Sequence, residues 1–485
     1  MKKISIIILS LAVTAFVFSS CADQLKTYPT DSTSEGELFK SIESAEFALN
    51  GVYRFMNTYE TYTPAWGSEN FGYPSMMICW DMVGEDMPKR DAGSAWFDYD
   101  YRLWVSAESG SSERPAGWWN FNYKIITVCN SVLASVPPLE GDQKLKNSLL
   151  GQAYAMRAFA YYHLINLYQL TYTEGTTNPG VPIYTEPTNK NTVGKGRGTV
   201  ADVYTQINDD LQKAIDMLKD AAAVKNKSQL DLYVAYGLKA RTALMQEDFD
   251  TAKEYAELAL TKPGLAIMGT GDVLGGFNSL DNAEWMWGFY TIESQATKTY
   301  SFMSHMDPAE AGGYAKNSAH LVSRWLYDNI DDDDTRKQWF IGPKYDLDAM
   351  DQEFIDKYDP TEDPAKRTKQ RALYYWEQEQ NALYNRDNTQ GFPYSANSYV
   401  QLKFRMKGPG VWTNDMLYMR ASEMYLIIAE ASIRKTATDY NAAVSALNSV
   451  VQPKLETYDA NTFPKAPVRT FDGYANDATF AARTL

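Results

Sequence analysis

The most regular hydrophobic pattern in the chain lies in residues 149–170, LLGQAYAMRAFAYYHLINLYQL. Apolar residues recur there every three or four positions along two neighbouring rows, and only a narrow stripe through Gln152, His163 and Asn166 is polar. A helix with so wide an apolar surface is enclosed by neighbours rather than lying on a surface. The pattern therefore predicts a buried helix against which other helices pack, in a scaffold for a binding site built elsewhere.

Helical spacing of apolar residues also occurs at residues 41–56, 118–136 and 199–218. Two further stretches, 230–260 and 419–450, each read as a pair of helices joined by a short turn. A small residue marks the close approach in each copy, and an aromatic residue marks the turn: Ala240 and Phe249, then Ala431 and Tyr440. Such repeats are typical of tetratricopeptide-like hairpins. We therefore predict a mainly α fold, a superhelix with helical repeats at about 117–263 and 418–450.

Two long regions, about 58–116 and 266–416, show no sustained period and are rich in Gly, Pro, Asp and aromatic residues. Within the second region, residues 283–290 and 398–406 read as short strands. Long ordered loops in compact proteins are usually functional. We therefore predict that these irregular regions carry the ligand site, as a loop-rich lobe with a few short strands.

The N-terminus reads as an export signal. Lys2 and Lys3 precede an apolar run that ends in Ser19-Ser20-Cys21, and this run is shorter than a membrane-spanning helix. A Cys after two small residues is similar to the lipobox of bacterial lipoproteins, and an ordinary signal with a chance Cys is the alternative. We predict a lipoprotein signal peptide at 1–20, lipidation at Cys21, a flexible tether at 21–40 and a single domain at 41–485.

Composition excludes several classes of function. The 485 residues carry a formal net charge of −15, which argues against a nucleic-acid partner because no basic excess would meet phosphates. Only three His occur, so zinc catalysis and His-based triads are poorly supported. The acidic run 331–334 is expected to be a solvated helix end, with calcium binding as the less favoured alternative. Cys79 and Cys129 could pair, but two separately buried thiols are favoured. We expect no metal site and no cofactor.

Five segments, in a fixed order, carry a family resemblance: GQAYAMRAFAYYHLINLY (151–168), GVPIYTEPT (180–188), RGTVADVYTQINDDLQKAI (197–215), SYVQLKFRM (398–406) and MRASEMYLIIAEA (419–431). With the lipobox at Cys21, the chain resembles the SusD/RagB family of outer-membrane nutrient-binding lipoproteins. The family usually continues past the last repeat into an acidic and arginine-containing helix. This chain stops at Leu485, the last residue of DATFAARTL, where that helix would begin. We therefore expect either a truncated sequence or a short member of the family.

The resemblance implies a function in nutrient uptake or polysaccharide utilisation. A cell-surface lipoprotein, held at the outer membrane by its lipid, would bind an oligosaccharide or another nutrient. It would deliver this ligand to a SusC-type TonB-dependent transporter and perform no chemistry on it. Two alternatives remain. One is a tetratricopeptide-type adaptor that binds a protein segment. The other, less favoured, is a glycoside hydrolase, for which no carboxylate pair stands out.

Candidate ligand contacts follow from sugar chemistry. The apolar face of a pyranose can lie on an aromatic ring while its hydroxyls need polar neighbours. We expect two groups on opposite sides of one site: Trp66, Trp96, Tyr99, Asp81 and Arg90 from the first region, and Trp287, Tyr290, Tyr300 and Tyr314 from the second. Trp285 and Trp287 alternate on the predicted strand, so one of the two should belong to the core.

Overall fold

The structure is a computed structural model of the 485-residue chain. It describes residues 39–59, 64–82, 87–89, 96–97, 113–310, 312–315, 318–342, 351–369, 371–372, 375 and 399–455. The predicted signal peptide, Cys21 and most of the tether lie outside these residues.

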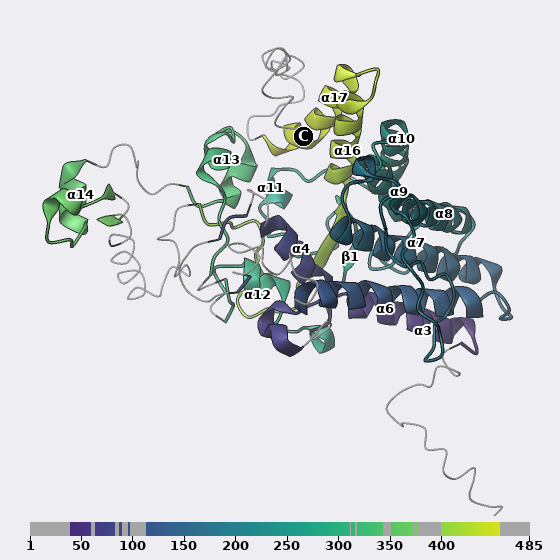
Figure 1. The fold of residues 1–485 in the computed structure, drawn as a ribbon. Helices are drawn as coiled ribbons and strands as arrows, with labels where there is room; N and C mark the ends of the chain where they lie inside the picture. Colours follow the sequence, from purple (N-terminus) through teal and green to yellow (C-terminus); the bar gives the residue numbers. More distant parts are fainter. Residues whose placement is uncertain are drawn as a thin grey trace, which may run out of the picture.

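A stack of helices forms the scaffold. Its members are α3 (Ile42–Phe55), α6 (Glu113–Ser135), α7 (Gln143–Tyr168), α8 (Val200–Lys219), α9 (Leu232–Met245), α10 (Phe249–Leu260), α16 (Ala421–Arg434) and α17 (Tyr440–Val451). Neighbours in sequence pack as antiparallel pairs, and α10 also packs on α16, so the last hairpin continues the stack (Figure 1). The mainly α fold and both predicted hairpins are confirmed.

Helix α7 is the centre of this scaffold, as its apolar pattern predicts. It begins earlier than expected, because Asp142 accepts hydrogen bonds from the amides of Lys144 and Leu145 and so caps the helix. Helices α6 and α8 pack on it. Gly151 permits the close approach of α8, since a Cβ there would lie 2.6 Å from Cγ of Leu218.

A buried ion pair joins α7 to α8. Nε and Nη2 of Arg157 donate to the two carboxylate oxygens of Asp210 at 2.8 and 2.6 Å, and Nη1 donates to Oδ1 of Asn130 at 2.7 Å. The same guanidinium reaches the carbonyl of Thr185, and Asn130 donates to the carbonyls of Tyr184 and Glu186. The loop between α7 and α8 is thus fastened to the scaffold through its main chain.

The rest of the described chain forms a region of short elements beside the stack (Figure 1). Its helices are α4 (Tyr73–Met82), α11 (Thr270–Val273), α12 (Phe302–Met306), α13 (Arg324–Asp328) and α14 (Gln352–Tyr358). Strands β1 (Trp285–Phe289) and β2 (Met416–Arg420) pair antiparallel, with Trp287 opposite Met419. Single 3-10 turns occur at Pro64–Glu69, Tyr172–Glu174, Glu293–Gln295, Thr335–Trp339, Pro364–Lys366 and Gln452–Lys454.

Two local predictions are wrong. Of the strand predicted at 398–406, the described residues 399–406 form no strand: Val400 and Gln401 make only isolated bridges, to Leu321 and Phe340. Helix α4 lies in a region predicted to be irregular, and its apolar residues surround the helix without a polar face. Cys79 on α4 and Cys129 on α6 are separately buried and are not joined by a disulfide, as favoured.

Candidate functional site

Four aromatic residues from three separated parts of the chain meet beside the helical stack. The rings of Trp96 and Tyr314 lie 4.2 Å apart, and those of Tyr59 and Tyr300 stack at 4.3 Å. The Tyr300 hydroxyl also contributes to raising the pKa of Tyr314, although burial is the larger cause. We call these four residues the aromatic wall. All four side chains are partly exposed, so the wall can offer ring faces to a ligand.

Trp96 is held in place by buried charged groups. The Lys89 ammonium donates to the carbonyl of Trp96, and the amide of Phe97 donates to Oε1 of Glu69 at 2.6 Å. Arg114, at the start of α6, pairs with the other oxygen of Glu69. Phe97 adopts a φ of 55°, which a residue with a Cβ rarely does, and its ring is buried. These contacts fix the turn and aim the indole of Trp96 toward Tyr314.

His305 lies behind the wall as a neutral support. Its ring stacks on Tyr314 at 4.8 Å and on Phe71 at 5.2 Å, and its Nε2 lies 2.9 Å from the carbonyl oxygen of Ser68. Burial lowers its pKa to about 3. The described residues contain no group of three or more His, Cys, Asp or Glu arranged for a metal ion. In the acidic run, Asp334 caps the 3-10 turn at Thr335–Trp339 and pairs with Arg336. The run is thus a helix end as expected, but only its first part is solvated, because Asp334 is buried.

A small cavity of about 30 Å³ with a mixed polar and apolar lining adjoins the wall. Phe71, which stacks on His305, lines it, as do Thr297 and Ser301 on either side of Tyr300. This volume suits one hydroxyl or one water molecule. Besides Trp412 and the apolar residues Pro74, Phe289, Phe302, Met303 and Met416, the lining contains side chains that can hydrogen-bond: Asn57, Thr291, Gln295, Thr297, Ser301 and Asn414. Rings with amides and hydroxyls beside them are the combination that a sugar requires.

The structure brings Trp96, Tyr300 and Tyr314 together from the two predicted groups. The prediction that Trp287 contacts the ligand is wrong. Its side chain is 0% exposed and lies in the core between Phe159 and Tyr418, so it cannot reach a ligand. Trp285 is buried as well, because both faces of this short strand are covered.

Two other predicted residues lie in different surroundings. Tyr290 packs on a separate cluster around Phe277 and Trp285, and its hydroxyl donates to Asp281 at 2.7 Å. Asp81 is exposed at the end of α4, where its charge acts on Lys403 and Tyr73. Tyr99, Arg90 and the side chain of Trp66 lie outside the described residues. Sequence reasoning missed Tyr59 and Trp412, which lie near the start of the first irregular region and near the end of the second.

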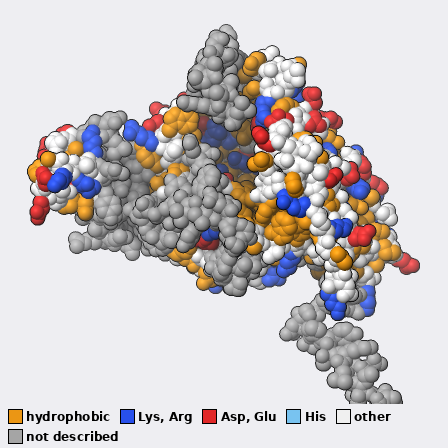
Figure 2. All heavy atoms as spheres, viewed as in Figure 1, with side chains coloured by type: hydrophobic (Ala, Val, Ile, Leu, Met, Phe, Trp, Pro, Cys, Tyr) orange, Lys and Arg blue, Asp and Glu red, His pale blue; other side chains and the backbone are white. Residues whose placement is uncertain are grey.

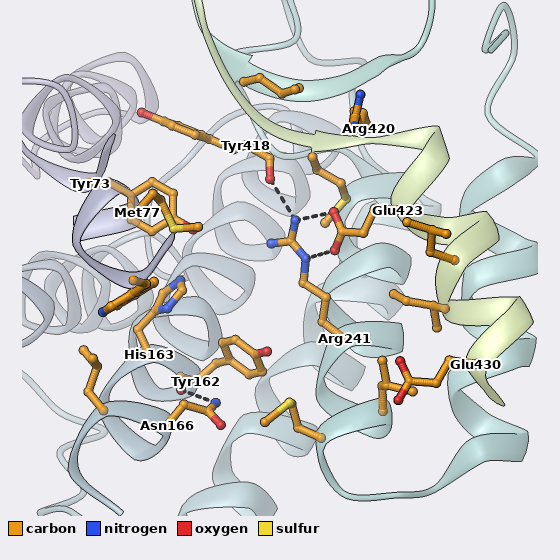
Figure 3. Close-up of a pocket in the computed structure, with 18 of the residues that line it drawn as sticks. Tyr73, Met77, Tyr162, His163, Asn166, Arg241, Tyr418, Arg420, Glu423 and Glu430 are labelled. Carbon is orange, nitrogen blue, oxygen red and sulfur yellow. Dashed lines mark hydrogen bonds and ion pairs between the residues drawn. The ribbon is translucent and has the colours of Figure 1, made fainter. Parts of the chain in front are cut away.

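A second and larger concavity opens between α4, α7, α9, α16 and β2. This groove has a volume of about 840 Å³ and is lined mainly by apolar and aromatic side chains. Figure 2 shows the hollow near the middle of the molecule, with hydrophobic and basic side chains at its edge. At its centre the Arg241 guanidinium donates to both oxygens of Glu423 and to the carbonyl of Tyr418 (Figure 3).

Two family models match successive parts of the chain. One, described as "Starch-binding associating with outer membrane", covers residues 81–244, and the other, the SusD family, covers residues 271–452. The chain belongs to the SusD/RagB family.

Individual relatives agree with this family. SusD-like protein P2 of Formosa agariphila is 24% identical over 54% of this chain and 46% of its own length. A SusD-like protein of Bacteroides ovatus is 24% identical over 57% of this chain and 48% of its own. This SusD/RagB chain therefore spans about half the length of the curated relatives it matches.

A crystal structure of a SusD-like carbohydrate binding protein from Bacteroides vulgatus superposes with a TM-score of 0.65 at 26% identity. The match covers 84% of this chain and 74% of that one. The helical hairpins and the adjoining short elements are therefore the SusD/RagB fold. Within the described ranges, no helix of this family member is both long and apolar enough to span a bilayer.

Proposed function

We propose that this chain is a cell-surface lipoprotein that binds a glycan at the aromatic wall. The arrangement of Trp96 against Tyr314 carries the proposal, because two regions far apart in sequence converge on one partly exposed aromatic surface. The neighbouring amides and hydroxyls of the small cavity would receive sugar hydroxyls. A solved relative of the same fold is described as carbohydrate binding, which supports this ligand class.

In this proposal the protein binds its ligand without chemistry. Among the described residues, the carboxylates near the wall serve the fold: Glu69 holds the Phe97 amide and Arg114, and Glu310 accepts from the amides of Gly312 and Gly410. Asp307 pairs with Arg405 at 3.0 Å. A hydrolase needs two carboxyl groups that face the substrate. Family membership further supports delivery of the ligand to a SusC-type TonB-dependent transporter at the outer membrane.

Replacing Trp96 tests the site. Trp96→Ala should weaken glycan binding about fivefold, because a ring face against a sugar contributes on the order of 1 kcal/mol. A panel of soluble oligosaccharides first identifies the ligand by isothermal titration calorimetry. The variant is then measured with that oligosaccharide.

Trp325→Ala is the matched control. Trp325 on α13 is 72% exposed and does not belong to the aromatic wall, so its loss should leave affinity unchanged. Equal affinities of the Trp96 variant and the unaltered chain would contradict this site. Turnover of the glycan that one carboxylate substitution abolishes would contradict the non-enzymatic role.

A further inference from the structure

Four positively charged side chains gather beside the last residue of β2. Lys403, Arg336 and Arg420, which ends β2, are partly exposed, whereas Lys454 is buried and donates to the carbonyl of Val450. An isolated bridge next to the turns that carry Arg336 and Lys454 brings these two turns together. This basic cluster stands out because the whole chain has a formal net charge of −15.

Aromatic rings surround the Lys403 ammonium. Its Nζ lies 5.0 Å from the centre of the Phe277 ring, 5.1 Å from that of Trp339 and 4.9 Å from that of Phe404. The guanidinium carbon of Arg420 lies 5.3 Å from the same Phe277 ring. Ring faces attract a cation but are not the oxygen acceptors that an ammonium prefers. No described residue accepts a hydrogen bond from Lys403, so its N–H groups can serve a ligand.

The Arg420 guanidinium is also incompletely paired. Its Nη1 is buried and forms no hydrogen bond within the described chain. Oε1 of Glu284 lies 3.7 Å from this nitrogen, which is too long for a hydrogen bond. That oxygen already accepts from the Ser422 hydroxyl, and the other oxygen of Glu284 accepts from the amide of Met268. Arg420 therefore has a donor to spare.

Two neighbouring carboxylates are already used by other cations. Nε and Nη2 of Arg336 donate to the two oxygens of Asp334 at 2.9 and 2.6 Å. Both oxygens of Glu423 accept from Arg241. In the described part of the cluster, Glu284 is then the buried carboxylate that faces the three remaining cations. Charge left without a counter-charge away from water is costly, so the cluster favours a bound anion.

The cations of this cluster also act on one another. Burial is the main cause that lowers the pKa of Lys403 to about 7 and that of Lys454 to about 8. The charges of Arg420 and Arg336 lower both pKa values further, whereas nearby carboxylates oppose this effect. The four side chains are thus close enough to repel one another, and an anion would relieve that repulsion.

We propose that Lys403 and Arg420 bind a doubly charged oxyanion, a sulfate or phosphate group, with Lys454 adding charge from the buried side. Ammonium and guanidinium groups form their strongest hydrogen bonds with such oxygens. Arg420 lines the groove, as Figure 3 shows, so the group can enter from there. The oxyanion is either a free ion or the charged group of a larger ligand.

Isothermal titration calorimetry of the full chain with sodium sulfate tests this site. The titration is run at pH 6, because Lys403, with a pKa of about 7, is then mostly protonated. Binding should be saturable, and sodium chloride at the same ionic strength should not reproduce it. Lys403→Gln should weaken sulfate binding about tenfold or more, because it removes a charged donor. Arg420→Gln should have a similar effect and serves as the test if the first variant does not fold.

Lys213→Gln is the matched control. Lys213 on α8 also lies over a ring, that of Tyr154, at 5.6 Å, so the substitution removes the same charge and the same kind of contact. Arg157 lies over that ring too, but Asp210 neutralises it. Sulfate affinity should stay unchanged. Equal losses in the Lys403 and Lys213 variants would overturn the proposal, as would the absence of saturable sulfate binding by the unaltered chain.

A sulfated monosaccharide and the same sugar without its sulfate separate the two sources of the oxyanion. Tighter binding of the sugar sulfate than of inorganic sulfate, lost in Lys403→Gln, would assign the group to a larger ligand. Equal affinities would assign the site to a free ion. Trp96→Ala should leave the affinity for inorganic sulfate unchanged, so this result does not depend on the aromatic wall.

Discussion

At the scale of single residues, the three histidines show how burial decides chemistry. Burial lowers the pKa of His163 and His305 to about 3 and that of His320 to about 4. For His163 the positive charge of Arg241 adds to this effect, and the rings of Trp80 and Phe159 lie against the imidazole. All three side chains are therefore neutral packing elements at physiological pH.

The neutral state of His163 predicts a pH dependence of stability. Its folded pKa of about 3 lies below the unfolded value of about 6.5, so the unfolded chain binds more protons between these values. The free energy of unfolding should thus be fully retained above pH 6.5 and fall as the pH drops toward 3. His163→Phe removes this contribution. Between pH 7 and pH 5 the variant should lose about 2 kcal/mol less than the unaltered chain.

Urea unfolding at both pH values measures this difference, and the change with pH, rather than the absolute stability, is the test. The carboxylates and the other two histidines are shared by both proteins, so their contributions cancel. Identical pH slopes would show that His163 is protonated, or solvated, in the folded chain.

At the scale of elements, long helices such as the 26-residue α7 were predictable from sequence, whereas the 10-residue helix α4 was not. The apolar residues of α8 recur at helical spacing and Thr199 is its N-cap, and both features can be recognised in the amino-acid sequence. α4 is apolar all round, so no period distinguishes it from a loop. The convergence of Trp96 with Tyr314 could be suspected, but the stacking of Tyr59 on Tyr300 depends on loop paths that no local pattern encodes.

Replacement by Ala should have opposite effects on stability at two glycines, Gly288 on β1 and Gly51 on α3. A Cβ at Gly288 would overlap the carbonyl oxygen of Met416 on the facing strand and lie 2.6 Å from Cδ2 of Leu280. Gly288→Ala should therefore destabilise the protein by about 1–3 kcal/mol. Gly51 on α3 is exposed with open space around it, so Gly51→Ala should stabilise by about 0.5–1 kcal/mol through helix propensity.

Thermal unfolding of the two variants in parallel provides the measurement. Each is an Ala replacing a Gly, so the chemical change is the same and only the surroundings differ. If Gly288→Ala were neutral, the strands would have to be farther apart than the structure places them.

At the scale of the whole molecule, a rigid helical stack carries a site built from irregular segments. The scaffold supplies Arg114, which fixes Glu69 and through it the Phe97 turn, so its position governs the aromatic wall. The fold was predictable because repeats and family segments extend through the sequence. The site was predictable only in part, because Trp287 and Tyr290 differ from Trp96 in burial and surroundings rather than in residue type.

Membrane attachment through Cys21 remains a prediction at this scale. Cys21→Ala, expressed in a Gram-negative host that processes lipoproteins, should move the protein from the membrane fraction to the soluble fraction, because the single lipidated residue is lost. Immunoblots of separated fractions measure the shift. A Cys79→Ala variant controls for thiol loss, and retention of the Cys21 variant in the membrane would place the anchor elsewhere.

The way in which the loop between α7 and α8 is held affects which of its positions can change. Helix side chains hold this loop by its main chain: Tyr123 and Arg157 donate to the carbonyls of Pro182 and Thr185. The Tyr161 hydroxyl donates to the carbonyl of Tyr184 and accepts from its amide. Every amino acid supplies the same carbonyl, so this grip does not depend on which side chains the loop carries. Substitutions at the exposed positions Thr185, Glu186 and Pro187 can therefore change the outer face of this loop while these main-chain contacts persist.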